Sequence, residues 1–301
     1  MRPRRGFALM AAMWLVVLMG ASAFELSVRS RQRRLAAANA IELVSARAAA
    51  SAALETGLAW LDDDTLRADP WTLGARTTTR PIALGAARAT IDIYDAASRL
   101  NLNTASEDDL RRLLNAAGVD AGDADRLAQR IMDWRDADRA PRGRGAERDA
   151  YLRNGARVLP PDAPFATIGE LADVDGMSTA ILARIAPSLT LAGSGQVNVN
   201  AASGLVLRSL PGIGIEAATI IERARPLRSL EDVTRKLSRG AAAAIAEAGP
   251  ELAQRIIFDT REIVVSAEGW LDGSPVRSRA ELLAFRTGDA MMVQHRRTLD
   301  P

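Results

Sequence analysis

Four carboxylates in one short stretch have the types and spacing that could bind a metal ion. Asp133, Asp136 and Asp138 lie within six residues, and Glu147 follows after a loop rich in Pro, Gly and Arg. Calcium takes about six to eight oxygen ligands, which closely spaced carboxylates can supply. The chain has no cysteine, and no histidine lies near this stretch, so a zinc site is implausible. The sequence therefore predicts a Ca²⁺ site formed by these four side chains.

The same carboxylates could instead form ion pairs, because basic side chains surround them. The arginines close to them in the sequence are Arg130, Arg135, Arg139, Arg142 and Arg144. The sequence alone leaves both interpretations open.

No group of residues has the pattern of a catalytic site. The only histidine, His295, lies beside Arg296 and Arg297 in what we predict to be a polar tail, with no acid to orient it. Ser–His–Asp catalysis needs a positioned imidazole. The glycines of residues 210–214 (LPGIG) match neither a P-loop nor a dinucleotide-binding pattern. We therefore predict that the chain is not an enzyme.

A second place for chemistry lies at the N-terminus, where Gly6 and Phe7 follow Arg4 and Arg5. Residues 7–24 form an uncharged run just long enough to span a bilayer. Three interpretations compete: a secretory signal cleaved after an Ala-Ser-Ala sequence, an uncleaved anchor, and a leader similar to that of prepilins. In prepilins a membrane peptidase cuts after the glycine on the cytoplasmic face, and the new N-terminal Phe is N-methylated. The resemblance implies processing between Gly6 and Phe7.

Residues 25–61 favour the prepilin interpretation because they continue the apolar run as a helix. They contain no proline and only one glycine, Gly57, and are rich in strong helix formers. A helix over residues 7–61 would be about 80 Å long at 1.5 Å per residue. Since arginines precede the apolar run, the N-terminus should face the cytoplasm. We predict a single-pass inner-membrane and spine helix over 7–61, a leader over 1–6 and a mainly periplasmic chain.

Two distant regions alternate in the manner of β-strands. Residues 88–95 place Ile91 and Ile93 on one face, and residues 262–270 and 276–285 flank a turn at Asp272-Gly273 that is typical of a hairpin. A lone hairpin is only marginally stable in water, so these regions should pair. We predict an α+β fold in which a small antiparallel sheet, from residues 62–103 plus 256–301, packs on the long helix. Residues 99–103 are interpreted as part of its strands.

The segment between these regions, residues 104–255, is predicted to be an all-α insertion built on an internal repeat. The sequence Asn-Leu-Asn-Thr-Ala-Ser at residues 101–106 recurs as Asn-Val-Asn-Ala-Ala-Ser at 198–203. Ser106 and Ser203 are predicted to cap the helices that follow. Three later turns, at 117–122, 174–177 and 210–214, resemble helix–hairpin–helix motifs, whose glycines let backbone approach a partner closely.

Helix–hairpin–helix motifs often bind DNA, but the charges here oppose it. Phosphate binding needs nearby Lys or Arg, whereas these hairpins carry Asp120, Asp123, Asp125, Asp175 and Glu216. We therefore predict that DNA is an improbable partner and that the insertion contacts protein.

Several motifs in this order resemble the general secretion pathway protein K family, the large minor pseudopilins of type II secretion systems. They are Arg5-Gly6-Phe7, the NLNTAS start, DWRDAD at 133–138, GAE with Tyr151, FATIGEL at 165–171, Gly176-Met177 and the second NVNAAS. The resemblance covers nearly the whole chain. It implies a pilin-like body with an inserted α-domain, bound calcium, and assembly at the pseudopilus tip with the minor pseudopilins I and J.

The resemblance also gives Ala11 a meaning. If cleavage follows Gly6, Ala11 is the fifth residue of the mature chain, where most pseudopilins carry a glutamate that pairs with the N-terminal amine of a neighbouring subunit. Without that carboxylate the chain should start the filament rather than extend it. The alternative function is a membrane-tethered DNA receptor that uses its helix–hairpin–helix elements.

Overall fold

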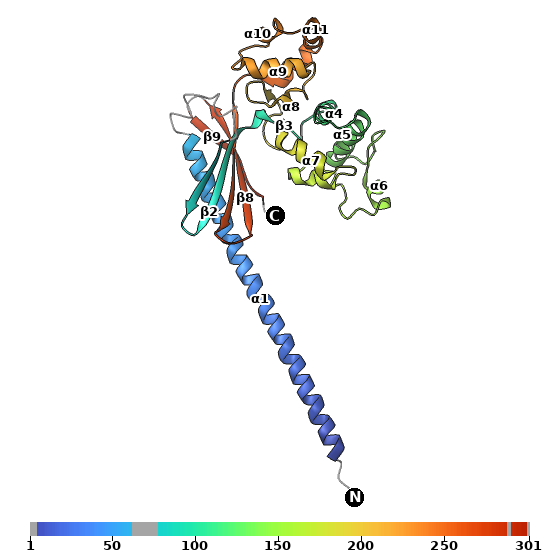
Figure 1. The fold of residues 1–301 in the computed structure, drawn as a ribbon, viewed down its shortest axis with the longest axis vertical. Helices are drawn as coiled ribbons and strands as arrows, with labels where there is room; N and C mark the ends of the chain where they lie inside the picture. Colours follow the sequence, from blue (N-terminus) through green and yellow to red (C-terminus); the bar gives the residue numbers. More distant parts are fainter. Residues whose placement is uncertain (1–4, 62–77, 288–289, 300–301) are drawn as a thin grey trace.

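One long helix, α1 (Arg5–Leu61), joins the N-terminal apolar run to a folded head (Figure 1). The computed structural model describes residues 5–61, 78–287 and 290–299. The head combines an antiparallel sheet, which packs against the C-terminal part of α1, with a helical insertion beside it. The α+β fold predicted from the sequence is confirmed.

The sheet has five strands in the order β1-β2-β7-β8-β9, and all neighbouring pairs are antiparallel. Its strands are β1 (Thr78–Leu84), β2 (Ala87–Asp95), β7 (Glu262–Leu271), β8 (Arg277–Thr287) and β9 (Ala290–Leu299). As expected from the alternation, Ile91 and Ile93 point into the core formed with α1, while Tyr94 lies on the opposite face. Gly273 takes a positive φ of 78° in the predicted hairpin turn between β7 and β8.

Small residues let α1 lie close against the sheet. The buried positions on the helix include Ala46, Ala49, Ala50 and Ala53. A methyl group on Gly269 of β7 would overlap the backbone of Ala46 and Ala50, and one on Gly57 would overlap Val265. The core between helix and sheet therefore excludes even one additional carbon at its closest points.

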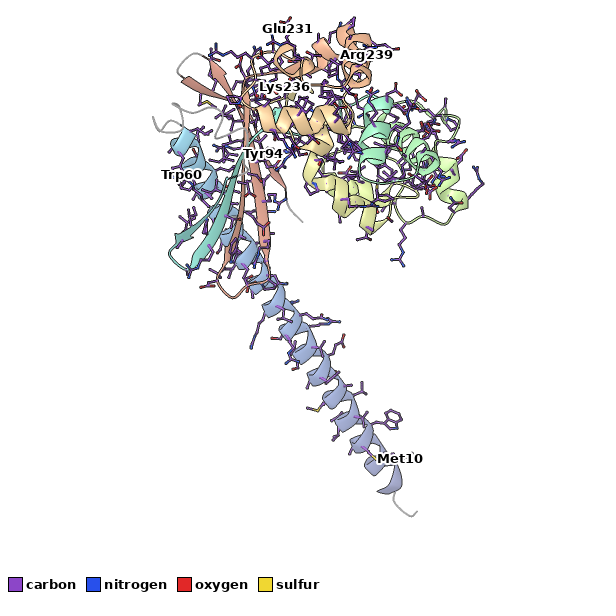
Figure 2. All side chains as sticks on the ribbon, turned by 45° about the horizontal axis from the view of Figure 1, so that its top comes forward. Met10, Trp60, Tyr94, Glu231, Lys236 and Arg239 are labelled. Carbon is purple, nitrogen blue, oxygen red and sulfur yellow. The ribbon has the colours of Figure 1, made fainter. Side chains whose placement is uncertain are left out.

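The N-terminal part of α1 makes no contact with the head and is exposed (Figure 2). Figure 2 shows Met10 near its free end and Trp60 at the sheet, where the Arg80 guanidinium lies 4.9 Å from the Trp60 ring. Among the described residues, this helix alone is long and apolar enough to cross a membrane. Residues 1–4 lie outside the described part, and so do the side chains of Gly6, Phe7 and Ala11.

The insertion leaves the sheet after β2 at Asp95 and returns to it at β7. Its longer helices are α4 (Glu107–Ala116), α5 (Ala121–Arg135), α9 (Ile215–Ala224) and α11 (Arg239–Glu247). Shorter helices are α6 (Arg148–Arg153), α7 (Thr179–Ile185), α8 (Gly204–Leu207), α10 (Glu231–Thr234) and α12 (Gly249–Arg255), with 3₁₀ turns η1 (Ala96–Ser98), η2 (Ile168–Asp173) and η3 (Ala186–Ser188).

Two of the predictions for this part of the chain are wrong in detail. β3 (Leu100–Asn101) does not join the main sheet but pairs in parallel with β4 (Leu189–Thr190). β5 (Val197–Asn198) pairs likewise with β6 (Ile256–Ile257), so the insertion is not purely helical. Each of these two-residue strands closes a helical unit, a long-range pairing that a local sequence pattern does not reveal.

A third correction concerns His295, which lies on the edge strand β9 and not in a polar tail. Most described side chains of β9 are exposed, so the strand lacks the apolar alternation by which strands are recognised. Arg297 of β9 forms an ion pair with Glu281 of the neighbouring β8, and its Nη2 lies 2.7 Å from Glu281 Oε2.

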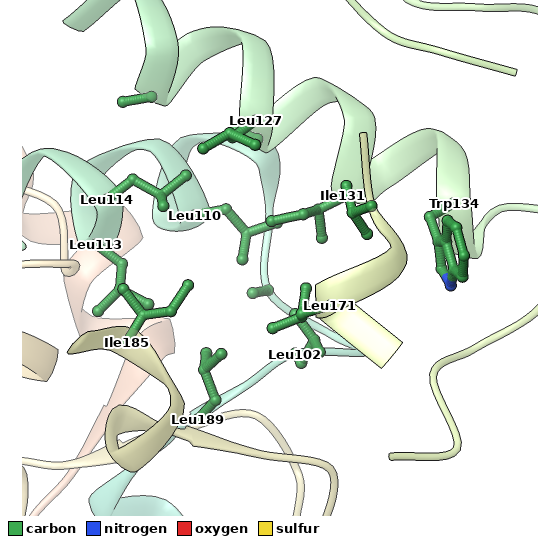
Figure 3. Close-up of a cluster of buried hydrophobic side chains, with 14 of the residues drawn as sticks. Leu102, Leu110, Leu113, Leu114, Leu127, Ile131, Trp134, Leu171, Ile185 and Leu189 are labelled. Atoms are coloured by element: carbon green, nitrogen blue, oxygen red, sulfur yellow. The ribbon is translucent and has the colours of Figure 1, made fainter. Parts of the chain in front are cut away.

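Two separate apolar cores hold the insertion together. The first is centred on α4 and α5 and contains Leu110, Leu127 and Trp134; in Figure 3 Leu110 and Leu127 lie near one another, and Trp134 lies apart from them at the end of α5. The second lies around α8 and α9 and contains Val206 and Ile221. The insertion is therefore built from two packed units, residues 100–190 and 197–257, which we call module 1 and module 2.

Candidate cation site and helical modules

The four predicted metal ligands lie around one loop of module 1. Asp133 is on the last turn of α5, Asp136 is its C-terminal cap, Asp138 follows in the loop, and Glu147 is the residue before α6. Ligand oxygens of Asp136, Asp138 and Glu147 lie within 4.8 Å of one another. The structure therefore brings three of the four together.

Glu147 has the environment expected of a metal ligand. Its side chain is buried, and neither carboxylate oxygen has a hydrogen-bond partner. Burial, followed by repulsion from Asp133 and then Asp162, raises its pKa from the ordinary value of 4.5 to about 7. A buried carboxylate without a donor is costly, and a bound cation would remove that cost.

Asp162 is a candidate ligand that the sequence reasoning missed. It has a positive φ of 52°, and its Oδ1 is buried without a partner, as is Oδ1 of Asp136. Asp162 lies fifteen positions beyond Glu147 in a proline-flanked loop. The sequence signal was weak, because an Asp between prolines is also an ordinary turn residue.

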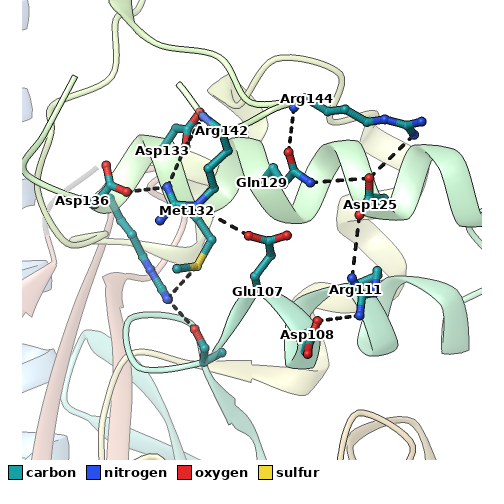
Figure 4. A network of polar contacts seen from close by, with 12 residues as sticks. Glu107, Asp108, Arg111, Asp125, Gln129, Met132, Asp133, Asp136, Arg142 and Arg144 are labelled. Atoms are coloured by element: carbon teal, nitrogen blue, oxygen red, sulfur yellow. Dashed lines mark hydrogen bonds and ion pairs between the residues drawn. The ribbon is translucent and has the colours of Figure 1, made fainter. Parts of the chain in front are cut away.

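Asp133 is held by an arginine and lies outside the group of three. Arg142 Nη1 lies 2.6 Å from Asp133 Oδ1 and 2.5 Å from Asp136 Oδ2, and the Arg142 backbone N–H donates to Asp133 (Figure 4). A side chain on Gly145 would overlap the Asp133 carboxylate, so glycine is required there. Both interpretations of this stretch are therefore needed: Asp133 and one oxygen of Asp136 pair with Arg142, whereas Asp136 Oδ1 and both oxygens of Glu147 have no partner.

These residues fit a hard cation. The unpaired atoms are carboxylate oxygens from Asp136, Glu147 and Asp162, which are the ligand type that Ca²⁺ prefers. Next to Asp133 in the chain, Trp134 stacks on Phe165 with ring centroids 6.1 Å apart and meets Tyr151 of α6 at 5.7 Å. These aromatic contacts pack α6, which begins directly after Glu147, against the end of α5.

The repeated Asn-x-Asn motif makes the same contacts in both modules. The first asparagine, Asn101 or Asn198, accepts from the backbone N–H two residues on. The side-chain amide of the second asparagine bonds with both the backbone N–H and the backbone C=O of one distant residue. Asn103 pairs in this way with Phe165, and Asn200 with Leu227. The two copies of the motif therefore share these hydrogen bonds as well as their sequence.

A half-buried arginine completes each copy. Arg135 donates to the carbonyls of Leu102 and Ala105, and Arg225 donates to those of Val199 and Ala202. Burial lowers the pKa of both guanidinium groups. Ser106 and Ser203 cap the helices that follow, as predicted.

Asp95 connects module 2 to the sheet. Its buried carboxylate accepts hydrogen bonds from Asn198 Nδ2 at 2.7 Å and Thr260 Oγ1 at 2.9 Å. Burial raises its pKa to about 6. These contacts tie the end of β2, the second Asn-x-Asn motif and the return to β7 into one junction.

The three hairpin turns have the expected geometry, with Gly118, Gly176 and Gly212 all at positive φ. Their surroundings are already filled. Asp120 caps the N–H groups at the start of α5, and a side chain on Gly212 would overlap the backbone oxygen of Ala244 in α11. In the first hairpin, the N–H groups that a phosphate would meet are therefore taken by the Asp120 carboxylate, whereas α9 after the third hairpin has no side-chain cap.

Comparison with known proteins was made for the sequence and for the fold. The model of the family described as type II secretion system protein K matches residues 91–194. The type II secretion system protein K of Klebsiella pneumoniae is 28% identical over 217 residues, which is 65% of this chain and 66% of that protein, just under two thirds of its length. Over residues 91–194 the chain is therefore similar to the protein K family of type II secretion systems, and the similarity to one member extends over 217 residues.

The fold agrees with this similarity. A chain in the crystal structure of the GspK–GspI–GspJ complex from enterotoxigenic Escherichia coli superposes with a TM-score of 0.61 and 19% identity. The match covers 91% of the chain and all of the other. The family-model match contains every candidate cation ligand and module 1, whereas module 2 follows it.

Proposed function

We propose that the chain is a minor pseudopilin that forms the tip of a type II secretion pseudopilus and so supports export of folded proteins across the outer membrane. The observation that carries the proposal is the similarity of residues 91–194 to the protein K family together with the long helix, sheet and inserted modules of the fold. This similarity also favours a structural component over an enzyme. The tip location, the partners and the processing are inferences from this likeness.

The N-terminus of such a subunit is processed by a prepilin peptidase between Gly6 and Phe7. The apolar helix that follows is retained, which anchors the chain in the inner membrane with its head in the periplasm. The mass of the mature N-terminal peptide tests this. We expect a chain that begins with N-methylated Phe7, and a Gly6→Leu variant that is not cut. A chain that begins at Phe24 would contradict the proposal.

Two features support a single copy at the tip. Ala11 cannot supply the carboxylate that would pair with a neighbour's N-terminal amine in the membrane, so the subunit gains no ion pair by docking beneath an earlier one. The insertion, which spans residues 96–261, projects beside the sheet (Figure 1) and would clash if repeated around a thin filament. Both features suit the subunit that starts the filament.

The partners we propose are the minor pseudopilins I and J. One structure that the fold matches is a chain of the crystal structure of a GspK–GspI–GspJ complex. Co-purification of the three proteins tests this proposal. Recovery of the chain without the other two, under conditions where they are stably expressed, would refute it.

We also propose that Ca²⁺ binds between Asp136, Asp138, Glu147 and Asp162 in a structural role, with Asp133 holding the loop through Arg142. Because a ligand that binds only the native state stabilises it, EGTA should lower the melting temperature. The Asp136→Ala variant should have the lowered value already and show no further change with EGTA.

A membrane-tethered DNA receptor is the competing function, favoured by the hairpin geometry alone. Asp120 and the close packing of Gly212 oppose it. Retention of the purified protein on DNA that falls steeply with salt would favour the receptor. We expect no such retention.

A further inference from the structure

Four arginines lie just beyond the apolar run of α1. Arg29, Arg31, Arg33 and Arg34 fall within six residues, and no acidic residue lies between Glu25 and Glu42. All four side chains are exposed. We call this group the arginine collar.

The collar has few protein partners. Arg29 pairs with Glu25 one turn earlier, whereas the other three guanidinium groups contact no carboxylate among the residues that the structure describes. This part of α1 stands clear of both sheet and insertion (Figures 1 and 2). The charges are therefore available to a ligand outside the chain.

The position of the collar along the helix sets what it can reach. At 1.5 Å per residue, Arg29 lies about 8 Å and Arg34 about 15 Å beyond Phe24, the last residue of the uncharged run. The polar layer on each side of a bilayer is about 5–8 Å thick. Side chains on a helix lean toward its N-terminus, which here points into the membrane, so the longer ones can reach back to the headgroups.

The collar also surrounds much of the helix. At about 100° per residue, the four side chains project at roughly 0°, 40°, 140° and 200° around the axis. A single partner helix would meet only one side of α1. A layer of phosphate groups around the helix would meet all four.

We propose that the arginine collar binds the phosphate headgroups of anionic phospholipids in the leaflet where α1 leaves the membrane. Guanidinium groups bind phosphate oxygens through two parallel hydrogen bonds, and clustered basic residues beside a membrane helix attract anionic lipid. The proposal rests on the membrane anchoring proposed above. The proposal assigns a role to four positive charges that otherwise oppose the predicted orientation of α1 in the membrane. Arginine is disfavoured directly after a membrane-spanning segment on the exported side.

The test uses the full chain reconstituted in bilayers of phosphatidylcholine with a minor fraction of phosphatidylglycerol. The lipids that remain bound after gentle detergent extraction are counted by mass spectrometry. We expect phosphatidylglycerol to be enriched about threefold or more over the bulk bilayer, and the enrichment to fall with salt. Changing Arg29, Arg31, Arg33 and Arg34 together to Gln should abolish it, while the matching Lys variant should keep much of it.

The control changes four exposed arginines far from the membrane to Gln, which alters the net charge equally. They are Arg148, Arg153, Arg223 and Arg239. This control should bind lipid as the wild type does. A protein that inserts but shows no phosphatidylglycerol enrichment, or a collar variant that retains it, would overturn the proposal. A wild-type chain that fails to insert at all would instead count against the membrane anchoring.

Discussion

At the scale of single residues, Glu147 is the group whose behaviour depends most on a bound cation. Its oxygens have no donor, and four neighbouring aspartates, Asp133, Asp162, Asp136 and Asp138, repel its charge. The fold therefore holds this carboxyl protonated up to about pH 7, unless a cation replaces the proton. Calcium and the proton compete for one site.

This competition predicts a pH dependence of stability. In the metal-free protein the folded state keeps a proton on Glu147 that the unfolded chain releases above its ordinary pKa of 4.5. The free energy of unfolding should therefore fall as the pH rises from 4.5 to about 7, and Ca²⁺ should restore it most strongly near pH 7. Denaturant titrations with EGTA or Ca²⁺ at several pH values measure this.

The Glu147→Gln variant separates the site from general acid effects. It should be more stable than the wild type in EGTA at pH 7. Its free energy of unfolding should lack the fall with rising pH that Glu147 causes, and it should respond less to Ca²⁺. Asp149→Asn, the same change on an exposed residue of α6, should behave as the wild type. Equal responses of both variants would contradict the assignment of Glu147.

Asn200 gives a second prediction at this scale. Its amide makes three buried hydrogen bonds, two with Leu227 and one with the Phe258 carbonyl. Asn200→Ala leaves these groups unpaired and should destabilise the protein by about 3 kcal/mol. Asn115→Ala, on an exposed helix position, should change stability by less than about 0.5 kcal/mol. A similar small effect at Asn200 would show that its hydrogen bonds contribute little.

Much of the candidate site could be predicted at the residue level, and the part that could not has a physical cause. The two Asn-x-Asn motifs and the serine caps that follow them form local hydrogen bonds. Such local contacts can be predicted directly from the sequence. Asp133 pairs with Arg142, and Asp162 joins the candidate cation ligands. Both arrangements depend on how the loop folds back. No spacing rule encodes that path.

At the scale of elements, the contact between α1 and the sheet rests on residues without side chains. Gly57 and Gly269 are the points of closest approach. The sequence predicted the helix, but not which glycine would face the sheet. That choice depends on the register of β7 against its neighbours, a long-range property.

The prediction at this scale concerns Gly269→Ala. The new methyl group would overlap the backbone of α1, so the helix must move, at a cost of about 1–3 kcal/mol. Gly240→Ala adds the same group in α11 where nothing lies within 4 Å, and should be neutral or slightly stabilising. Thermal denaturation of both variants in detergent compares them. Equal melting temperatures would argue against close helix–sheet packing.

The two strands of the main sheet that the sequence reasoning missed share one property. β9 is an edge strand with most described side chains exposed, and β1 is an edge strand that contains Pro81. Edge strands need no apolar face on both sides, and proline is tolerated there. The inner strands β2 and β7 alternate or are mostly buried, which is why they were found.

At the scale of the whole molecule, the two modules and the sheet act as one connected head. Arg112 donates to the Ser209 carbonyl at 2.7 Å and lies 2.8 Å from the buried Asp109, which Arg255 of α12 also contacts. Module 1 is thus tied to module 2, and Asp95 ties module 2 to the sheet. A rigid, bulky head on one helix suits a subunit used once.

The measurement that tests this account most directly is the composition and position of the complex that contains the chain. Native mass spectrometry of the membrane-extracted assembly should show one copy of the chain with one each of the I and J pseudopilins. A label on the chain should mark only one end of the filament. Labels repeated along the shaft would contradict the account. So would a chain that functions only when Ala11 is changed to Glu.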